Sequence, residues 1–123
     1  MSRTPLIVGN WKMNKTIKAT RDFCLRLKSE LAGLKDRRVE VAVAPPFPAL
    51  AVAAEALLGS SISVSAQDVF WAESGAFTGE VSPPMLLDAG CRYAIIGHSE
   101  RRQYFYENDE SVNKKAAALI KSG

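Results

Sequence analysis

The chain has 123 residues, of which 47% are hydrophobic and 24% are charged, and these are the proportions of an ordinary soluble globular domain. Its 16 basic and 13 acidic side chains leave a formal net charge of only +3, and the basic residues are spread along the sequence. We therefore expect neither nucleic acid nor a membrane surface as a partner, whereas a small anionic ligand is compatible with this charge.

The cysteines and the N-terminus indicate a cytoplasmic protein. Cys24 and Cys91 are isolated, without metal-like spacing or a dense disulfide pattern, so we predict two reduced packing residues. The N-terminus lacks an apolar signal core, and Glu55 interrupts the most apolar helical stretch, so we expect neither export nor a membrane span.

The first half of the chain alternates between short apolar runs and helical patterns. Leu6 to Asn10 is predicted to be a strand, and Thr16 is predicted to cap a helix from Ile17 to about Leu34. Val39 to Ala44 is a second predicted strand. The prolines that follow it end the strand and start an alanine-rich helix, which extends from about Pro48 to Leu58.

The second half repeats this alternation. Ile62 to Ala66 is predicted to be a strand, and a long irregular stretch, 67–81, follows it. A helix is expected from Ser82 to Gly90. A fourth strand, Tyr93 to Gly97, and a last helix from Asn108 or Asp109 to about Lys121 complete the chain.

Four βα units in a row predict parallel strands with right-handed crossovers in an α/β fold. No linker or low-complexity segment divides them, so residues 1–123 are expected to form one domain. The units are compatible with a small open doubly wound sheet or with half of a closed barrel.

The most informative stretch is 93–102, where a short apolar run ends in a glycine and then presents one histidine and three charged residues. His98 is the only histidine, and it follows the carboxyl end of the fourth predicted strand. Ligands bind at that edge of parallel α/β folds. A lone histidine is more often a structural residue, so position alone makes His98 a candidate.

Four stretches together carry a family resemblance. They are Val8 to Asn14 (VGNWKMN), Ala44 to Pro46 (APP), Gly75 to Glu80 (GAFTGE) and Ile95 to Arg102 (IIGHSERR). In this order and at this spacing they closely resemble triosephosphate isomerase. The resemblance covers essentially the whole chain but only the first half of that family's (β/α)₈ barrel, which needs about 250 residues. It implies a parallel (βα)₄ half of a TIM barrel.

The resemblance also implies a reaction and the residues that carry it. The family interconverts dihydroxyacetone phosphate and glyceraldehyde 3-phosphate in glycolysis and gluconeogenesis, and removal of a proton next to the carbonyl creates an enediolate oxyanion. Catalytic Lys12 would supply positive charge to the phosphate and the oxyanion, and Asn10 would donate a hydrogen bond to the substrate. Catalytic His98 would be the electrophile and proton shuttle, in the neutral form that is the known case for this family. Glu100 would be a supporting acid, and no metal or organic cofactor is implied.

Each of these residues also has an ordinary explanation. Lys12 alone would more often be a solvated lysine, Asn10 a turn former at a strand end, and 100–102 an exposed charged turn. Their combination within the flanking motifs favours the functional interpretation.

The stretch Gly75 to Glu80 resembles the family's dimer loop, which inserts into the neighbouring subunit. The resemblance implies dimer contacts by Phe77 and Thr78 at the loop tip, by Met13 in the receiving wall, and by Glu80 with Arg101 as a cross-subunit ion pair. The alternative is a surface loop without a partner. An exposed phenylalanine at the tip favours an interface.

The family's glutamate base, its lid and its phosphate-gripping loops belong to strands six to eight, beyond these residues. We nominate none of the glutamates present as a substitute base, so the isolated chain is expected to be nearly inactive. Its open inner face and strand edges are expected to pair with another copy or with a complementary C-terminal half. The phosphorylated triose would be its small-molecule partner.

Two alternatives remain at this point. The first is a noncatalytic, self-associating half barrel, either a fragment or an engineered folding module. The second is an independent flavodoxin-like binding domain, which the absence of a glycine-rich phosphate loop disfavours.

Overall fold

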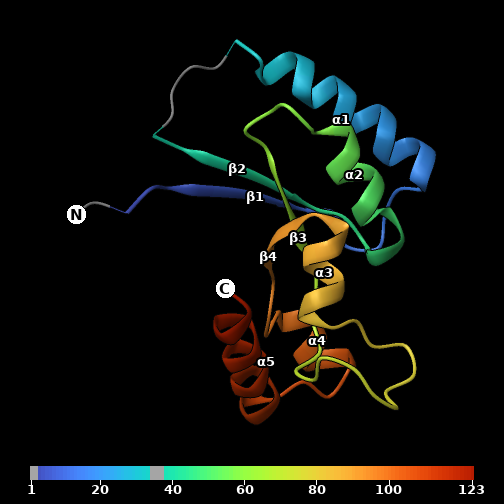
Figure 1. The fold of residues 1–123 in the computed structure, drawn as a ribbon, viewed down its shortest axis with the longest axis vertical. Helices are drawn as coiled ribbons and strands as arrows, with labels where there is room; N and C mark the ends of the chain where they lie inside the picture. Colours follow the sequence, from blue (N-terminus) through green and yellow to red (C-terminus); the bar gives the residue numbers. More distant parts are fainter. Residues whose placement is uncertain (1–2, 34–37) are drawn as a thin grey trace.

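The computed structural model describes residues 3–33 and 38–123, and its centre is a parallel sheet (Figure 1). The strands are β1 (Leu6–Asn10), β2 (Glu40–Ala44), β3 (Ser63–Ala66) and β4 (Cys91–Ala94), and they lie side by side in the order β1-β2-β3-β4. All three strand pairs are parallel. The prediction of consecutive βα units around a parallel sheet is therefore confirmed.

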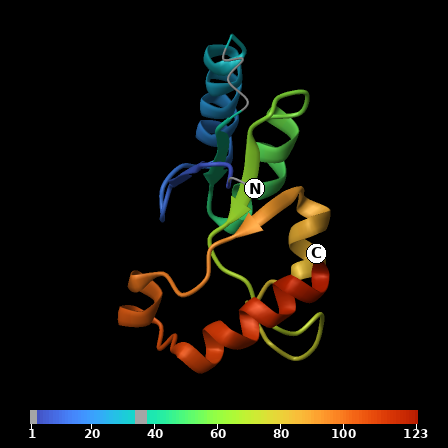
Figure 2. The same ribbon diagram turned by 90° about the vertical axis from the view of Figure 1, so that its left-hand side faces the viewer.

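Helices follow the strands along the chain. They are α1 (Ile17–Leu31), the 3₁₀ helix η1 (Phe47–Ala49), α2 (Leu50–Ala56), α3 (Pro83–Ala89), α4 (Ser99–Tyr104) and α5 (Asp109–Ser122). Figures 1 and 2 show α1 and α2 side by side against one side of the sheet, while α5 lies beside α3 at the opposite end of the molecule. The layers match those of a barrel wall, in which helices cover the outside of the strands.

Side chains cap three of the helices at or near the predicted starts. The hydroxyl of Thr16 accepts from the N–H of Ala19 at 3.2 Å, and that of Ser82 accepts from the N–H of Met85 at 3.4 Å. Asn108 forms a reciprocal capping box with Ser111 at the start of α5. These side chains satisfy backbone donors that the first turn of a helix leaves unpaired.

Several predicted boundaries were wrong by a few residues. The first helix ends at Leu31, and its predicted end at Leu34 falls outside the described residues. Strands β2 and β3 each begin one residue later than predicted. The second helix begins as η1 and ends at Ala56 rather than at Leu58, because the proline-containing turn is wound as a 3₁₀ helix.

The fourth strand differs most from its prediction. It occupies Cys91–Ala94 instead of Tyr93 to Gly97, because pairing with β3 begins immediately after Gly90. One further bond, from the N–H of Ile95 to the carbonyl of Ala66 at 2.9 Å, ends the pairing where β3 itself ends. The residues between this point and His98 are therefore an ordered connection and not strand.

The hydrophobic core lies between the sheet and helices α1, α2 and α3. Its buried members come from every one of these layers: Cys24, Val43, Leu50, Ala53, Leu57, Ile62, Val64, Ala66, Val69, Leu86 and Cys91. Both cysteines are free and buried, as predicted, and burial raises the pKa of the Cys91 thiol to about 11. These thiols therefore act as small apolar packing groups.

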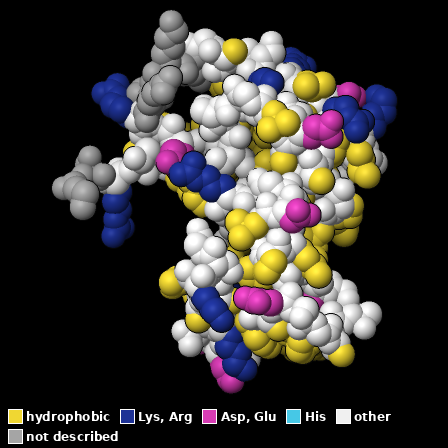
Figure 3. Space-filling model, in the orientation of Figure 1, with side chains coloured by type: hydrophobic (Ala, Val, Ile, Leu, Met, Phe, Trp, Pro, Cys, Tyr) yellow, Lys and Arg dark blue, Asp and Glu magenta, His cyan; other side chains and the backbone are white. Residues whose placement is uncertain are grey.

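Strand β1 lies at the edge of the sheet and is poorly covered. Leu6, Ile7 and Val8 are 43, 61 and 38% exposed, although all three are apolar. Figure 3 shows further hydrophobic side chains at the surface, interspersed with charged ones. In residues 3–33 and 38–123, no helix is long and apolar enough to cross a membrane.

Candidate active site

The polar residues predicted from the motifs gather at the carboxyl edge of the sheet. Asn10 is the last residue of β1, Lys12 follows two residues later, and His98 lies in the connection between β4 and α4. A direct contact joins the segments that follow the two outer strands, β1 and β4, because Lys12 Nζ lies 2.7 Å from Glu100 Oε1. The fold thus brings Lys12 next to His98 and Glu100, which lie more than 80 positions later in the sequence.

Lys12 has an unusual backbone. Its φ of +56° lies in the left-handed region, which residues with a Cβ rarely adopt. The N–H of Lys12 donates to Asn10 Oδ1 at 2.9 Å. Because this bond occupies the amide oxygen of Asn10, the amide nitrogen is the end of that side chain suited to donating to a ligand.

His98 is the N-cap of α4 and accepts a hydrogen bond there. Its Nδ1 receives the N–H of Glu100 at 3.0 Å. A ring nitrogen that accepts carries no proton, so this contact favours neutral imidazole with its proton on Nε2. His98 is therefore held in the form that can donate from Nε2 to a carbonyl oxygen.

Glu100 connects the cation and the imidazole. A hydrogen bond from Lys12 is the main cause that lowers the pKa of Glu100; the charge of Lys12 acts in the same direction, and desolvation opposes them. The second carboxylate oxygen of Glu100 lies 3.7 Å from His98 Nδ1. An ionised Glu100 thus keeps the Lys12 ammonium group beside the histidine.

Aromatic residues fix the loop that carries Lys12. The N–H of Trp11 donates to the carbonyl of Ala44 at 3.1 Å, and the Trp11 ring packs edge-on against Phe23 with centroids 5.2 Å apart. The Lys15 ammonium lies 4.8 Å from the centroid of the Phe23 ring. These contacts were not predicted from the sequence, because they depend on how α1 packs beside the loop.

A buried cluster of charges anchors α4, and the sequence analysis missed it. Lys115 Nζ contacts Asp68 Oδ1 at 2.7 Å and also bonds to Glu107, with all three side chains nearly buried. Arg101 Nε lies 3.2 Å from Asp68 Oδ2 and 3.7 Å from Glu107 Oε2. Two acids and two bases balance in charge, as buried ions require. The cluster joins α4, α5 and the segment that follows β3.

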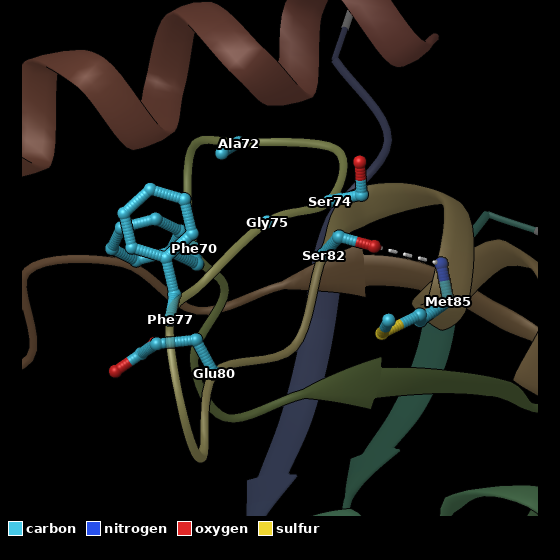
Figure 4. Close-up of a pocket in the computed structure, with 8 residues that line it drawn as sticks. All are labelled: Phe70, Ala72, Ser74, Gly75, Phe77, Glu80, Ser82 and Met85. Atoms are coloured by element: carbon cyan, nitrogen blue, oxygen red, sulfur yellow. Dashed lines mark hydrogen bonds between the residues drawn. The ribbon is translucent and has the colours of Figure 1, made fainter.

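The proposed dimer loop folds back upon itself. The Phe77 ring packs on Phe70 with centroids 4.5 Å apart, and both rings border a small pocket that Figure 4 shows between the loop and the start of α3. Phe77 remains 45% exposed and Met13 is 93% exposed. Thr78 and Glu80 are exposed as well.

Arg101, the predicted cross-subunit partner of Glu80, pairs within its own chain with Asp68 and Glu107. Its remaining guanidinium nitrogens leave room for a further acceptor. The dimer contacts, including the Glu80–Arg101 pair, therefore stay predictions.

This arrangement suits a small anion whose negative charge grows on an oxygen atom. It offers an ammonium group, a neutral amide donor and a neutral imidazole donor at one edge of a parallel sheet. Within 3–33 and 38–123, no group of three or more His, Cys, Asp or Glu side chains is arranged to hold a metal ion.

The family model for triosephosphate isomerase matches residues 5–123. The chain belongs to the triosephosphate isomerase family. Relatives named triosephosphate isomerase include proteins from Moorella thermoacetica, 56% identical over 120 residues, and Pelobacter propionicus, 57% identical over 121 residues; each match covers 98% of this chain and 47% of the relative. A third, from Acetivibrio thermocellus, is 54% identical and is matched along all of this chain and 48% of its own length.

The chain therefore spans about half the length of the triosephosphate isomerases that it matches. Its parallel sheet and alternating helices form half of the family's (β/α)₈ barrel, as the motifs indicated. The lysine, histidine and glutamate contacts all lie at the edge where that fold places its reactions.

Proposed function

We propose that residues 1–123 are the N-terminal half-barrel domain of a triosephosphate isomerase, which interconverts dihydroxyacetone phosphate and glyceraldehyde 3-phosphate through an enediolate. The observation that carries the proposal is the contact of Lys12 with Glu100 beside a His98 whose Nδ1 accepts a hydrogen bond. Membership of the family supplies the reaction class. Its setting would be glycolysis and gluconeogenesis in the cytoplasm.

The roles follow from the charges. Lys12 is a fixed positive charge for the phosphate and for the oxygen that becomes negative, and it acts as a catalytic residue for that reason. His98 donates from Nε2 to the substrate carbonyl and carries protons between the two oxygens. Asn10 donates from its amide nitrogen to the substrate, and Glu100 holds Lys12 in place. None of these steps requires a metal or an organic cofactor.

The proposal also requires a catalytic base that residues 1–123 do not supply. In the resembling family the base that removes the carbon-bound proton lies in the second half of the barrel, so the 123 residues alone should give no turnover above background. Activity should appear when a C-terminal half completes the barrel. Met13, Phe77, Thr78, Glu80 and Arg101 would then contact a second subunit in a homo-oligomer.

The decisive experiment joins this chain to the C-terminal half of the Moorella thermoacetica relative and measures isomerase activity in a coupled assay. His98→Gln should lower kcat by about 10² to 10⁴, the range for loss of a positioned acid or base. Lys12→Met should lower kcat/KM by at least about 10² because it removes charge stabilisation of the oxyanion. Lys18→Met, which removes an exposed lysine paired with Asp22 on α1, is the matched control and should have no effect.

Turnover by the unassisted 123 residues would contradict the proposed division of roles, since it would require a base among them. A completed barrel that remains inactive, but associates stably through the half barrel, would favour the noncatalytic alternative. The exposed apolar edge of β1 is the observation that supports that alternative.

A further inference from the structure

Gln67 directly follows β3, and its side chain hydrogen-bonds to the backbone of Lys12. Its amide nitrogen donates to the carbonyl of Lys12 at 2.8 Å and to the carbonyl of Ala44 at 2.7 Å. A carboxamide nitrogen has two hydrogens, and both partners here are oxygen acceptors. The two contacts therefore use the full donor capacity of the side chain and define its orientation.

These bonds act at a strained point of the chain. Lys12 has a left-handed backbone, and its N–H is already bonded to Asn10 Oδ1. Gln67 bonds the carbonyl on the other side of the same residue. Both peptide groups that flank the Lys12 Cα are thus held by side chains. A rare backbone conformation persists only where its surroundings determine it in this way.

Gln67 also joins three segments of the site. The carbonyl of Ala44, its second acceptor, additionally receives the N–H of Trp11. A single partly buried amide therefore connects the end of β3, the end of β2 and the loop after β1. A change in this amide should move the Lys12 backbone, and with it the direction in which the ammonium group projects.

We propose that Gln67 is a positioning residue, which holds Lys12 in its left-handed conformation so that the ammonium group reaches Glu100 and the anion site. Gln67 bonds to the backbone of Lys12 and so acts through it. The link to catalysis rests on the function proposed above, whereas the placement of Lys12 can be measured without turnover.

The first test titrates the Glu100 carboxyl group by ¹³C NMR in the 123-residue chain. The structure holds Lys12 against Glu100, so the wild-type pKa of Glu100 should lie below the ordinary glutamate value. Gln67→Met keeps the length of the side chain but removes both donors, and it should raise that pKa to the value found in Lys12→Met. Gln103→Met makes the same replacement at an exposed position of α4 and should leave the pKa unchanged.

The second test measures isomerase activity in the barrel completed with the C-terminal half. Gln67→Met should lower kcat/KM by about 100-fold, the loss expected from a small displacement of a group that positions substrate. Gln103→Met should retain wild-type activity. An inactive wild-type barrel would refute the proposed isomerase but leave the titration result valid.

The proposal fails if the pKa of Glu100 is the same in folded Gln67→Met as in the wild type. Should that variant not fold, Gln67→Glu replaces the donor with a carboxylate of the same shape and is titrated instead. If neither variant folds, as judged by circular dichroism, the amide stabilises the whole chain rather than placing Lys12, and the proposal is overturned.

Discussion

At the scale of single residues, Tyr106 has a strained backbone outside the site. Its φ is +59° and it is 93% exposed, so a bulky aromatic residue occupies the left-handed region without burial to compensate. Residues with a Cβ lose roughly 1–2 kcal/mol there. This strain is a local cost, because Tyr106 lies in the connection between α4 and α5.

Replacing Tyr106 with glycine should therefore stabilise the chain. The relief of strain is offset by the greater freedom of glycine in the unfolded chain, which costs roughly 0.5–1 kcal/mol. We expect a net gain of about 0.5–1 kcal/mol in the free energy of unfolding, measured by urea denaturation. Tyr106→Ala removes the same ring but keeps the Cβ, and it should show no such gain. Equal stabilities of the two variants would refute the explanation from backbone strain.

Some residues of the site could be predicted from the sequence and others could not. Lys12 and His98 were identified because both stand within distinctive motifs, and the structure brings them to one edge of the sheet. Gln67 was missed, because a single polar residue after a strand carries no pattern. Its importance comes from two backbone carbonyls, one of them 55 positions away in the sequence.

At the scale of elements, the turn from α3 into β4 is determined by close packing. Gly90 has a φ of +99°, and a Cβ at this position would lie 2.5 Å from the Cβ of Ala54 on α2. This distance is far inside van der Waals contact. Glycine is therefore required both for the backbone conformation and for the approach of α2 to the end of α3.

Gly90→Ala should destabilise the chain by about 2–5 kcal/mol, the sum of left-handed strain and overpacking. The free energy of unfolding in urea measures this loss. Gly79→Ala is the matched control: Gly79 has a φ of +92°, but no atom lies within 4 Å of its added Cβ. It should lose only about 1–2 kcal/mol from strain. If the two variants lost the same free energy, the contact with Ala54 would be unimportant.

Element types were predictable, and element ends were less so. The caps at Thr16, Ser82 and Asn108 depend on local side-chain bonds. The sequence predicted Thr16 as a cap, Ser82 as the start of a helix, and Asn108 or Asp109 as the start of the last helix. The end of β4 depends instead on where β3 stops pairing, which is a property of a different segment. Likewise, the six residues of α4 are stabilised by the buried charge cluster, which was not predicted from the sequence.

At the scale of the whole molecule, strand β1 presents an exposed apolar edge. Among the described residues β1 pairs only with β2, and its apolar side chains are partly exposed. An unpaired apolar strand edge is a template for pairing with another chain. Parallel strands were predicted from the succession of βα units, which left the strand order open, and the order β1-β2-β3-β4 is that of half a barrel with β1 at an edge.

We expect the 123-residue chain to self-associate at micromolar concentration, as measured by sedimentation velocity. Ile7→Lys places a charge on the β1 edge and should shift the population toward monomer. Ile120→Lys introduces the same charge on α5, where Ile120 is 81% exposed, and should leave association unchanged. A monomeric wild-type chain would contradict the assignment of β1 as the associating edge.

The position of β1 has a further consequence during protein synthesis. In a closed eight-stranded barrel the first strand made is sealed by the last. The 120 matched residues are 47% of the Moorella relative, so about 135 residues of that protein lie outside the match. At about 5–20 residues per second, a ribosome needs about 7–27 seconds to make them.

Strands and helices form much faster than that. The N-terminal strands and helices therefore have time to form while Leu6, Ile7 and Val8 remain uncovered at the edge. During this period the unpaired edge of β1 is available to neighbouring nascent chains.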